Sequence, residues 1–329
     1  MSKSNKQTTL QAINEALHLA MAADDKVLIL GEDVADREGG GVVGVTKGLS
    51  EKFGTDRVVS TPISEQAIIG AAIGAALAGY KPVAEIMLMN FTAVAMDMIC
   101  NHAAKLRYMS GGQSSVPIVI RMMTGAGISA AGQHSDFLEA WFAHTPGIKV
   151  VAPSCATDAK GLMLSCIQDP DPCIFIESVM SYYTPADAAE NDEPIPLGKA
   201  RIAKEGSDIT IISYAFMAQT ALAAAAQLEK DGISAEVIDL RTISPWDREA
   251  VLKSVKKTGR ALIAHEAVRN FGVGAEIAST ISEELFGQLK APVARLGAPF
   301  SAVPFNKKLE TEYVVSAEKI AAKAKLMFG

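Results

Sequence analysis

The sequence predicts an α/β protein built from two doubly wound domains. Short runs of β-branched residues alternate with longer helical segments from residue 27 onward, which is the pattern of parallel strands joined by crossover helices. The chain has 329 residues, of which 49% are hydrophobic and 21% charged. It can therefore bury a substantial core and is long enough for two domains.

The N-terminal half is expected to supply the larger domain. Thr8 and Gln11 have the spacing of a helix capping box, which marks the first helix. The predicted helix 65–79 carries small residues at nearly every third or fourth place, so it can lie close against other elements or another subunit. Further helices are expected over 90–110 and 156–169, which end at glycine and proline signals. The predicted strands are 27–30, 58–60, 82–88, 116–123, 147–153 and 172–178.

A stretch rich in proline and acidic residues interrupts the alternation at 186–199. We predict that it is a linker between a domain over 1–185 and a second domain over 200–329. In the second domain the α/β alternation resumes. Its strands are expected at 208–215, 235–241, 261–267 and 292–298, and its helices at 217–231, 247–257, 274–289 and 316–328.

Composition and charge exclude several classes of partner. The net charge of −6 provides no basic field that would attract nucleic acid or an anionic membrane surface. The polar N-terminal tail does not resemble a secretory leader, and no apolar run is long enough to span a bilayer. We therefore expect a cytoplasmic protein. The four cysteines lack CxxC spacing, which favours reduced structural thiols over a disulfide framework or a zinc site.

A glycine-rich turn at TGAGISA invites a nucleotide-binding interpretation. Gly125, Gly127 and Ala130 fit a loose GxGxxA motif after a predicted strand. A second glycine-containing loop follows where the helix of a dinucleotide fold should begin, and the expected acidic residue about 20 positions on is missing. Dinucleotide binding is therefore disfavoured.

Glu65 stands in the first turn of the predicted apolar helix, directly after a strand and a turn that contains proline. A carboxylate at this end of a helix is stabilised in its ionised form by the helix dipole. Most glutamates in a first turn do no more than complement that dipole. Spacing alone therefore does not make Glu65 catalytic.

His134 lies in a predicted loop, AAGQHSD, among small residues that allow other groups to approach. Histidines in such loops are better acid/base candidates than histidines on helix faces or at element ends. We therefore single out His134 and regard the other four histidines as structural.

The chain carries a set of motifs that is more specific than any one of them. They are LGEDV (30–34), GVTKGL (44–49), TPISE (61–65), NHAAKLRYMSGG (101–112), VPIVIR (116–121), QHS (133–135), HTPGIKVVAPS (144–154), DAKGL (158–162) and VIDLRTISPWD (237–247). Together they resemble the β subunit of the thiamine-diphosphate-dependent first component of the pyruvate, branched-chain 2-oxo acid and acetoin dehydrogenase complexes. The resemblance implies a pyrimidine-binding domain followed by a transketolase C-terminal-like domain.

The resemblance assigns a cofactor role to four residues. Glu65 matches the glutamate that hydrogen-bonds a ring nitrogen of the cofactor's aminopyrimidine, which promotes formation of the reactive ylid. Ile63, Met87 and Phe91 match positions that line the pyrimidine pocket, with Phe91 as the stacking aromatic. On residue type alone these three would be ordinary core.

His134 matches the family histidine near the substrate and the incoming lipoyl group, where it handles a proton during acyl transfer. The usual His-Ser-Gln reads His134-Ser135-Asp136 here, and the added carboxylate either raises the basicity of the histidine or faces solvent. A second departure is Met98, where many members have glutamine, and it bears on the details of subunit contact.

The resemblance also implies a structural potassium ion, bound mainly by backbone oxygens. Such ligands suit a hard, weakly bound cation, although the same residues would read as a plain helix C-terminus. The matching positions are Ile118, Cys166, Ile167, Asp169 and Asp171.

Missing motifs point to a partner chain. Thiamine-diphosphate enzymes that bind the diphosphate themselves show GDG followed by NN, whose oxygens hold magnesium, and neither motif occurs here. The resemblance therefore implies that an α subunit holds the diphosphate and magnesium. It implies a heterotetramer of two α and two β chains that docks on a dihydrolipoyl acyltransferase with its lipoyl domain.

Three functions remain open from the sequence. The first is a 2-oxo acid dehydrogenase that decarboxylates its substrate and reductively acylates a lipoyl arm. Its relative is an acetoin dehydrogenase, which GGVVGVTKGL and APFSAVPFNKKLE favour, whereas VIDLRTISPWD and KTGRALIAHEA favour the branched-chain group. The second is a self-sufficient transketolase-type enzyme, which the missing magnesium motif disfavours, and the third is a non-catalytic nucleotide-binding or assembly protein on the same fold.

Overall fold

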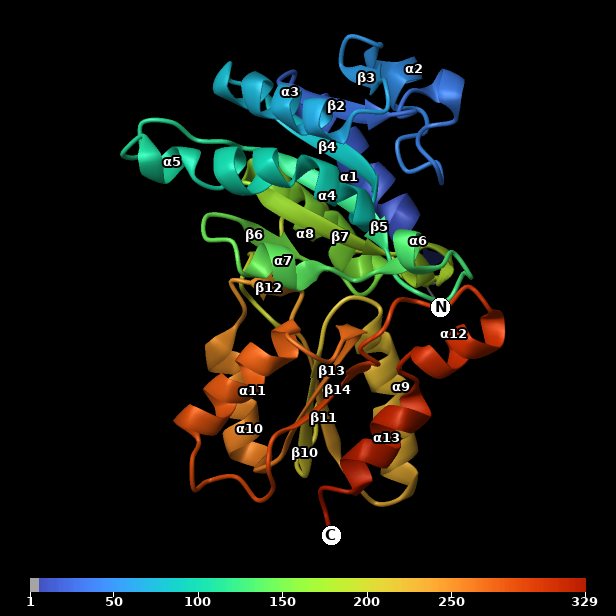
Figure 1. The fold of residues 1–329 in the computed structure, drawn as a ribbon, viewed down its shortest axis with the longest axis vertical. Helices are drawn as coiled ribbons and strands as arrows, with labels where there is room; N and C mark the ends of the chain where they lie inside the picture. The colour runs from blue at the N-terminus through green and yellow to red at the C-terminus, as the bar shows by residue number, and fades with distance from the viewer. Residues whose placement is uncertain (1–5) are drawn as a thin grey trace. The chain divides into compact units, whose positions relative to one another are not determined.

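The computed structural model describes residues 6–329, which form two compact units. The first unit comprises residues 6–124 with Trp141–Leu197, and the second comprises Gly125–Ala140 with Gly198–Gly329. Each unit is an α/β layer structure around its own sheet (Figure 1). The segment Gly125–Ala140, which the sequence assigns to the N-terminal domain, clusters with the second unit.

A parallel sheet forms the centre of the first unit. Within the unit its strand order is β6-β7-β5-β4-β2-β3, and every neighbouring pair is parallel. Long β-branched and aliphatic runs are buried on both faces, as a sheet covered by helices requires. The strands are β2 (Val27–Glu32), β3 (Val58–Thr61), β4 (Lys81–Leu88), β5 (Val119–Thr124), β6 (Lys149–Val151) and β7 (Cys173–Ser178).

Two pairs of helices cover this sheet. Helix α1 (Thr9–Ala23) packs against α8 (Ala156–Gln168), and their apolar faces share one core with the strands. The predicted capping box at the start of α1 is present, because the Thr8 side chain accepts from the Gln11 amide and the Gln11 side chain accepts from the Thr8 amide. Helix α3 (Glu65–Leu77) packs against α4 (Thr92–Asp97). Shorter helices are η1 (Asp36–Glu38), α2 (Leu49–Phe53), α7 (Glu139–Ala143), which extends into this unit, and η4 (Val179–Tyr183).

The segment predicted as one helix over 90–110 is broken into several turns. They are η2 (Met89–Phe91), α4, the π-helical turn η3 (Met98–Ala103) and α5 (Leu106–Met109). In the π-helical turn the amide of Ala104 donates to the carbonyl of Ile99, five residues back. Gly147 lies directly against the Ala104 carbonyl, where any Cβ would collide with the oxygen. The wider turn and the glycine therefore form one close contact that periodicity alone does not reveal.

The region predicted as a linker is anchored to the first unit through most of its length. Strand β8 (Ala186–Asp187) pairs with β1 (Lys6–Gln7) in an antiparallel ladder. Further on, the Ile195 amide donates to the Gly161 carbonyl, and the Ser165 hydroxyl donates to the Ile195 carbonyl. The domain boundaries expected from the sequence stay a prediction.

The second unit is built on a smaller sheet with the order β14-β13-β10-β11-β9. Helices α9 and α13 lie side by side on one face and α10 and α11 on the other (Figure 1). The strands are β9 (Arg201–Lys204), β10 (Ile209–Ser213), β11 (Ala235–Asp239), β13 (Ala261–Val268) and β14 (Ala294–Ala298), with a short β12 (Thr242–Ser244). The helices are α6 (Gly132–Ser135), α9 (Met217–Lys230), α10 (Arg248–Thr258), α11 (Val273–Glu284), α12 (Lys307–Tyr313) and α13 (Ala317–Lys325). The antiparallel edge strand β9 is not predicted from the sequence.

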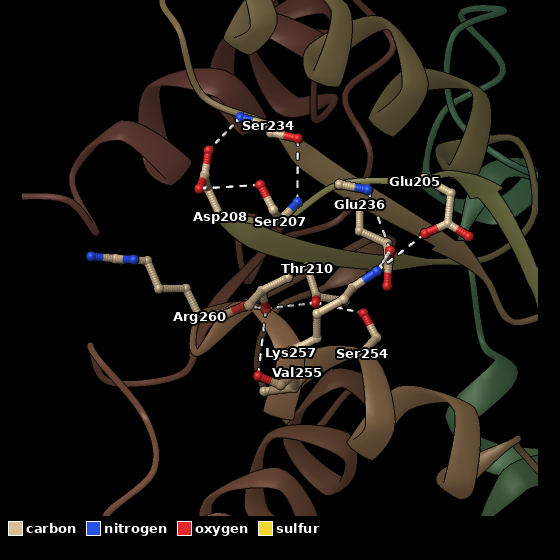
Figure 2. A network of polar contacts seen from close by, with 12 residues as sticks. Glu205, Ser207, Asp208, Thr210, Ser234, Glu236, Ser254, Val255, Lys257 and Arg260 are labelled. Carbon is tan, nitrogen blue, oxygen red and sulfur yellow. Dashed lines mark hydrogen bonds and ion pairs between the residues drawn. The ribbon is translucent and has the colours of Figure 1, made fainter.

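A polar network fixes the edge of this sheet (Figure 2). The ammonium group of Lys257 is paired with the carboxylates of Glu236 and Glu205, and Glu236 also accepts from the Gly206 amide at 3.3 Å. Gly206 lies against the backbone of Ala235, so a Cβ at this position would collide with it. The network therefore joins the loop after β9 to β11 and α10.

The structure also describes the cysteines and the lengths of the apolar helices. Cys100, Cys155, Cys166 and Cys173 are all free thiols. No helix in residues 6–329 combines the length and the apolar character needed to cross a bilayer.

Candidate active site

The carboxyl edge of the first sheet contains a topological switch point. Strand β2 has β3 on one side and β4 on the other, and all three run parallel. In an open parallel sheet, the connections after two adjacent strands lead to opposite sides of the sheet at the point where the strand order reverses. The crevice between these connections is the usual ligand site. Glu32 ends β2, Thr61 ends β3 and Leu88 ends β4.

Glu65 stands at this edge as the first residue of α3, after the N-cap Ser64. Its side chain is half-buried, and the Ser64 side chain makes no capping hydrogen bond. The pKa of the neighbouring Glu32 is raised, mainly by burial and then by the charges of Asp33 and Glu65. The carboxyl group at the end of β2 therefore interacts with the carboxyl group at the start of α3. Sequence reasoning assigns no role to Glu32, for which the only signal was its place in the LGEDV motif.

The three other predicted cofactor residues lie on elements that border the same edge. Met87 is half-buried near the end of β4, and Phe91 is half-buried in the turn η2 that follows. Ile63 lies between β3 and α3 and is 76% exposed. An aliphatic side chain this exposed is costly unless something covers it.

Helix α3 presents an apolar face to the surface. Beyond the buried Ile68, Ile69 and Ile73, the opposite side is formed by small or aliphatic residues and includes Leu77, which is 51% exposed. Helices that are apolar all round are normally buried. The exposed members of this face are Ala67, Ala71, Gly74, Leu77 and Ala78. In the described residues of the single chain, this apolar face of α3 is therefore uncovered.

Met98, one of the two departures from the family pattern, also lies beside this helix. It is half-buried, and a Cβ placed on Gly70 of α3 would lie 3.6 Å from its sulfur, which is ordinary van der Waals contact. The thioether thus packs between α3 and the π-helical turn, where its flexibility suits an irregular gap.

A buried ionic cluster joins the strands behind the edge. The Arg121 guanidinium on β5 binds Glu177 on β7 through two hydrogen bonds of 2.6 and 2.7 Å, and it also binds Glu85 on β4. Tyr182 also donates to Oε2 of Glu177, the oxygen that accepts from Nη2 of Arg121. Burial raises the pKa of Glu85, although the charge of Arg121 acts in the opposite direction. Because Glu85 precedes Met87 by two residues, the cluster fixes the strand end that carries the predicted pocket.

His134 lies in the second unit, on the short helix α6, and its side chain is exposed. Its neighbour Asp136 is half-buried, and the charge of Asp136, after burial, contributes to raising the pKa of Tyr313 to about 12. The carboxylate that departs from the family pattern is therefore close enough to Tyr313 to act on its ionisation.

The predicted potassium ligands gather around the end of α8. The Ile118 carbonyl accepts from the Cys173 amide at 2.9 Å, and the Cys166 carbonyl accepts from the Asp169 amide at 3.3 Å. Each carbonyl oxygen has a second lone pair for a cation. Ile167 is buried in the last turn of the helix.

The two aspartates of this set already have cationic partners. Lys149 contacts Asp169 at 2.5 Å, and Arg107 contacts Asp171 at 2.5 Å. A cavity of about 570 Å³ opens beside them, lined in part by Arg107, Lys149 and Asp171. Among residues 6–329 no group of three or more His, Cys, Asp or Glu side chains is arranged to hold a metal. Any ion here would depend on backbone oxygens.

Comparisons with known proteins find two domains along the chain. Residues 5–185 match the transketolase pyrimidine-binding domain and residues 198–320 match the transketolase C-terminal domain. A solved structure, a split-gene transketolase described as an inactive β4 tetramer, aligns over 97% of both chains with a TM-score of 0.80 and 24% identity. The fold therefore defines a transketolase-type protein, as the sequence predicts.

Curated relatives narrow the class. The chain is 46% identical over 322 residues to the β subunit of acetoin:2,6-dichlorophenolindophenol oxidoreductase from Cupriavidus necator, covering 95% of each chain. It is 46% identical to the β subunit of the pyruvate dehydrogenase E1 component from Rickettsia felis (92% of each chain) and 44% identical to the mitochondrial one from Pisum sativum (98% of this chain, 91% of that one). The chain belongs to the family of β subunits of the E1 component of pyruvate and acetoin dehydrogenases. The predicted family and enzyme class are thereby confirmed.

Proposed function

We propose that this chain supplies the pyrimidine-binding half of a thiamine diphosphate site in an enzyme that oxidatively decarboxylates a small 2-oxo acid and transfers the acyl group to a lipoyl domain. One observation carries the proposal. Glu65 stands half-buried at the head of a helix whose apolar face is uncovered in the single chain. That arrangement suits a carboxylate whose low-dielectric surroundings are completed by another subunit.

The residues at the sheet edge fit the pyrimidine end of the cofactor. Glu65 offers a carboxylate to hydrogen-bond a ring nitrogen from the first turn of α3. Phe91 offers an aromatic face for stacking, and Met87 and Ile63 offer apolar contacts. When bound, the cofactor supplies the electron sink that carbon–carbon cleavage needs. The chain's own contribution is to hold the ring, exclude water and keep a proton acceptor at the ring nitrogen.

The diphosphate end requires a second chain. The sequence contains neither GDG nor NN, so we propose that an α subunit holds the diphosphate through magnesium, in a heterotetramer of two α and two β chains. A dihydrolipoyl acyltransferase partner is proposed on the same family basis, whereas cytoplasmic localisation is proposed from the composition of the chain.

We assign a role in the transfer of the acyl group to the lipoyl domain to His134. An imidazole that is exposed on a short helix is accessible to a large incoming domain, and histidine can exchange a proton near neutral pH. We propose that it manages the proton when the acyl group passes to the lipoyl thiol. Potassium at the loop after α8, held by the Ile118 and Cys166 carbonyls with Ile167, Asp169 and Asp171, is proposed as a structural ion.

Acetoin cleavage is a second candidate, favoured by the 46% identity to an acetoin oxidoreductase β subunit over 95% of both chains. The two functions differ in substrate and share the cofactor site. Purified α and β chains should be assayed together with pyruvate, branched-chain 2-oxo acids and acetoin, with 2,6-dichlorophenolindophenol as the electron acceptor. Turnover of acetoin alone would select the second candidate.

The cofactor role of Glu65 is tested by Glu65→Gln in the assembled enzyme. We expect turnover to fall by about a hundredfold or more, the range for loss of a proton-transfer group, while α and β still form a complex. Glu51→Gln, an exposed glutamate on α2, is the matched control and should keep its activity. Full turnover of the Glu65→Gln enzyme would refute the assignment.

A further inference from the structure

The glycine-rich loop after β5 has an unusual backbone. Gly125 and Gly127 have φ values of 117° and 119°, and the non-glycine residues Ser129 and Ala131 have φ values of 58° and 62°. Positive φ is unfavourable for residues with a Cβ and is maintained only where the surroundings impose it. Something therefore holds this loop in shape.

Glu310 on α12 provides that constraint. Its carboxylate accepts from the Gly127 amide at 2.7 Å, from the Ser129 amide at 3.0 and 3.1 Å, and from the Ser129 hydroxyl at 3.2 Å. The side chain is only 2% exposed. Converging backbone amides of this kind form an anion-binding nest, and here the anion is a carboxylate from the chain itself.

This contact explains why the motif resembles a nucleotide-binding loop although the helix and the acidic residue of a dinucleotide fold do not follow it. In dinucleotide-binding folds the glycines allow backbone amides to approach a phosphate. In this chain the amides of Gly127 and Ser129 are directed at Glu310, 183 and 181 residues further along the sequence. The anion site is occupied from within.

The neighbouring residues reinforce the same attachment. Ala126 packs against an apolar cluster of Ala298, Val303 and Tyr313. A Cβ at Gly132 would lie 3.1 Å from the side chain of Ala302, so the start of α6 is also in close contact. The loop is therefore held at both ends by the segment 298–313.

We propose that Glu310 is a positioning residue that holds the His134 loop in the conformation needed for acyl transfer. The His134 amide donates to the Ala131 carbonyl at 3.3 Å, so α6 begins directly from the strained part of the loop. Without the carboxylate, Ser129 and Ala131 relax from positive φ and the imidazole loses its fixed place. The proposal rests on the proposed role of His134, and Glu310 itself does not touch substrate.

The experiment compares Glu310→Ala, Glu310→Gln and Glu310→Asp in the assembled enzyme with Glu312→Gln. Glu312 is an exposed glutamate on the same helix and serves as the matched control. Hydrogen exchange over residues 125–135 reports the loop directly. Two kinetic assays separate the steps: turnover with 2,6-dichlorophenolindophenol, which needs no lipoyl carrier, and reductive acylation of an isolated lipoyl domain.

We expect exchange in residues 125–135 to rise about tenfold or more in Glu310→Ala, because its opening becomes local and inexpensive. Reductive acylation should fall by about tenfold or more, as misplacement of an acid/base group predicts, while dye-linked turnover stays within twofold. Glu310→Asp should recover part of the acylation rate. Glu310→Gln keeps the side-chain shape and one acceptor oxygen, so it decides the matter if the alanine variant does not fold.

Three results would overturn the proposal: unchanged exchange, unchanged acylation despite faster exchange, or an equal loss in both kinetic assays. Failure of the proposed function looks different. If His134→Ala acylates the lipoyl domain normally, the role of His134 is rejected, whereas the exchange result for Glu310 still reports whether the contact holds the loop.

Discussion

The hydroxyl of Tyr214 donates a 2.7 Å hydrogen bond to Oε1 of Glu139, and both side chains are almost completely buried. The second carboxylate oxygen of Glu139 has no hydrogen-bond partner among the described residues. Burial raises the pKa of Glu139 to about 7, although the bond from Tyr214 acts to lower it. The ring of Tyr214 stacks on that of His265, with the ring centroids 6.2 Å apart. Burial raises the pKa of Tyr214, and the charges of Glu139 and Glu266 act in the same direction.

Stability should therefore depend on pH through Glu139. Its pKa in the folded chain lies above the ordinary value of 4.5, so the folded state binds the proton more tightly than the unfolded state. The contribution is complete below pH 4.5 and is lost as pH rises through 7. We expect a loss on the order of 3 kcal/mol at most, at 1.36 kcal/mol per unit of pKa.

Urea unfolding of Glu139→Gln and of the parent chain at a series of pH values measures this effect. The parent chain should lose stability relative to the variant between pH 4.5 and about 7. Glu276→Gln, an exposed glutamate on α11, should follow the parent. Parallel curves for the parent and Glu139→Gln would contradict the prediction.

Removing Arg121 should destabilise the first unit strongly. Arg121→Met leaves the carboxylates of Glu85 and Glu177 buried without their cation, and loss of one partner of a buried pair costs about 3–5 kcal/mol. Arg37→Met, at a side chain that is 75% exposed, should change stability by no more than about 0.5 kcal/mol. Chemical unfolding followed by circular dichroism measures both. An Arg121→Met chain as stable as the parent would show that the cluster contributes no net stability.

The exposed face of α3 should be needed for assembly and not for folding. Ala71→Asp places a charge in the middle of this face, which another subunit is expected to bury, and an unpaired charge is costly to bury. We expect α–β association to weaken by at least about tenfold, which is 1.4 kcal/mol, with an unchanged circular dichroism spectrum. Ala226→Asp on the exposed side of α9 is the control. Sedimentation velocity of each variant mixed with the α chain measures the association. If Ala71→Asp forms complexes as readily as the parent chain, this face of α3 is not the interface.

Potassium should stabilise the first unit if the carbonyls of Ile118 and Cys166 bind it. A ligand at a hundred times its dissociation constant adds about 2.7 kcal/mol to the free energy of unfolding. Thermal unfolding in potassium, sodium and choline chloride at equal ionic strength measures this, and only potassium should raise Tm. Equal Tm values in the three salts would contradict potassium binding and would show that the contacts with Lys149 and Arg107 hold the loop without an ion.

Much of the fold follows from local patterns, and its irregular parts do not. Buried strands such as β5 and β7 are continuous apolar runs, and the capping box at Thr8 and Gln11 is a local signal that the structure reproduces. The π-helical turn Met98–Ala103 leads into Ala104, whose carbonyl lies against Gly147, and this contact joins residues that are far apart in the sequence. Strand β9 is short and lies at a sheet edge, where alternation is a weak signal.

The candidate site shows the same limit. The first-turn position of Glu65 was predicted, but sequence spacing could not separate a catalytic carboxylate from one that only complements a helix dipole. Its interaction with Glu32 arises because parallel strands bring their ends together. The partner of Gly127 is 183 residues away, so the sequence disfavoured a nucleotide at this loop but could not show that the fold provides an internal anion.

The uncovered aliphatic side of α3 also has a consequence for how the protein is made. A chain synthesised without a partner would expose this apolar face to other copies of itself, to chaperones and to proteases. If the proposed α subunit covers this face, synthesis of both chains together would bury it soon after translation and limit such contacts.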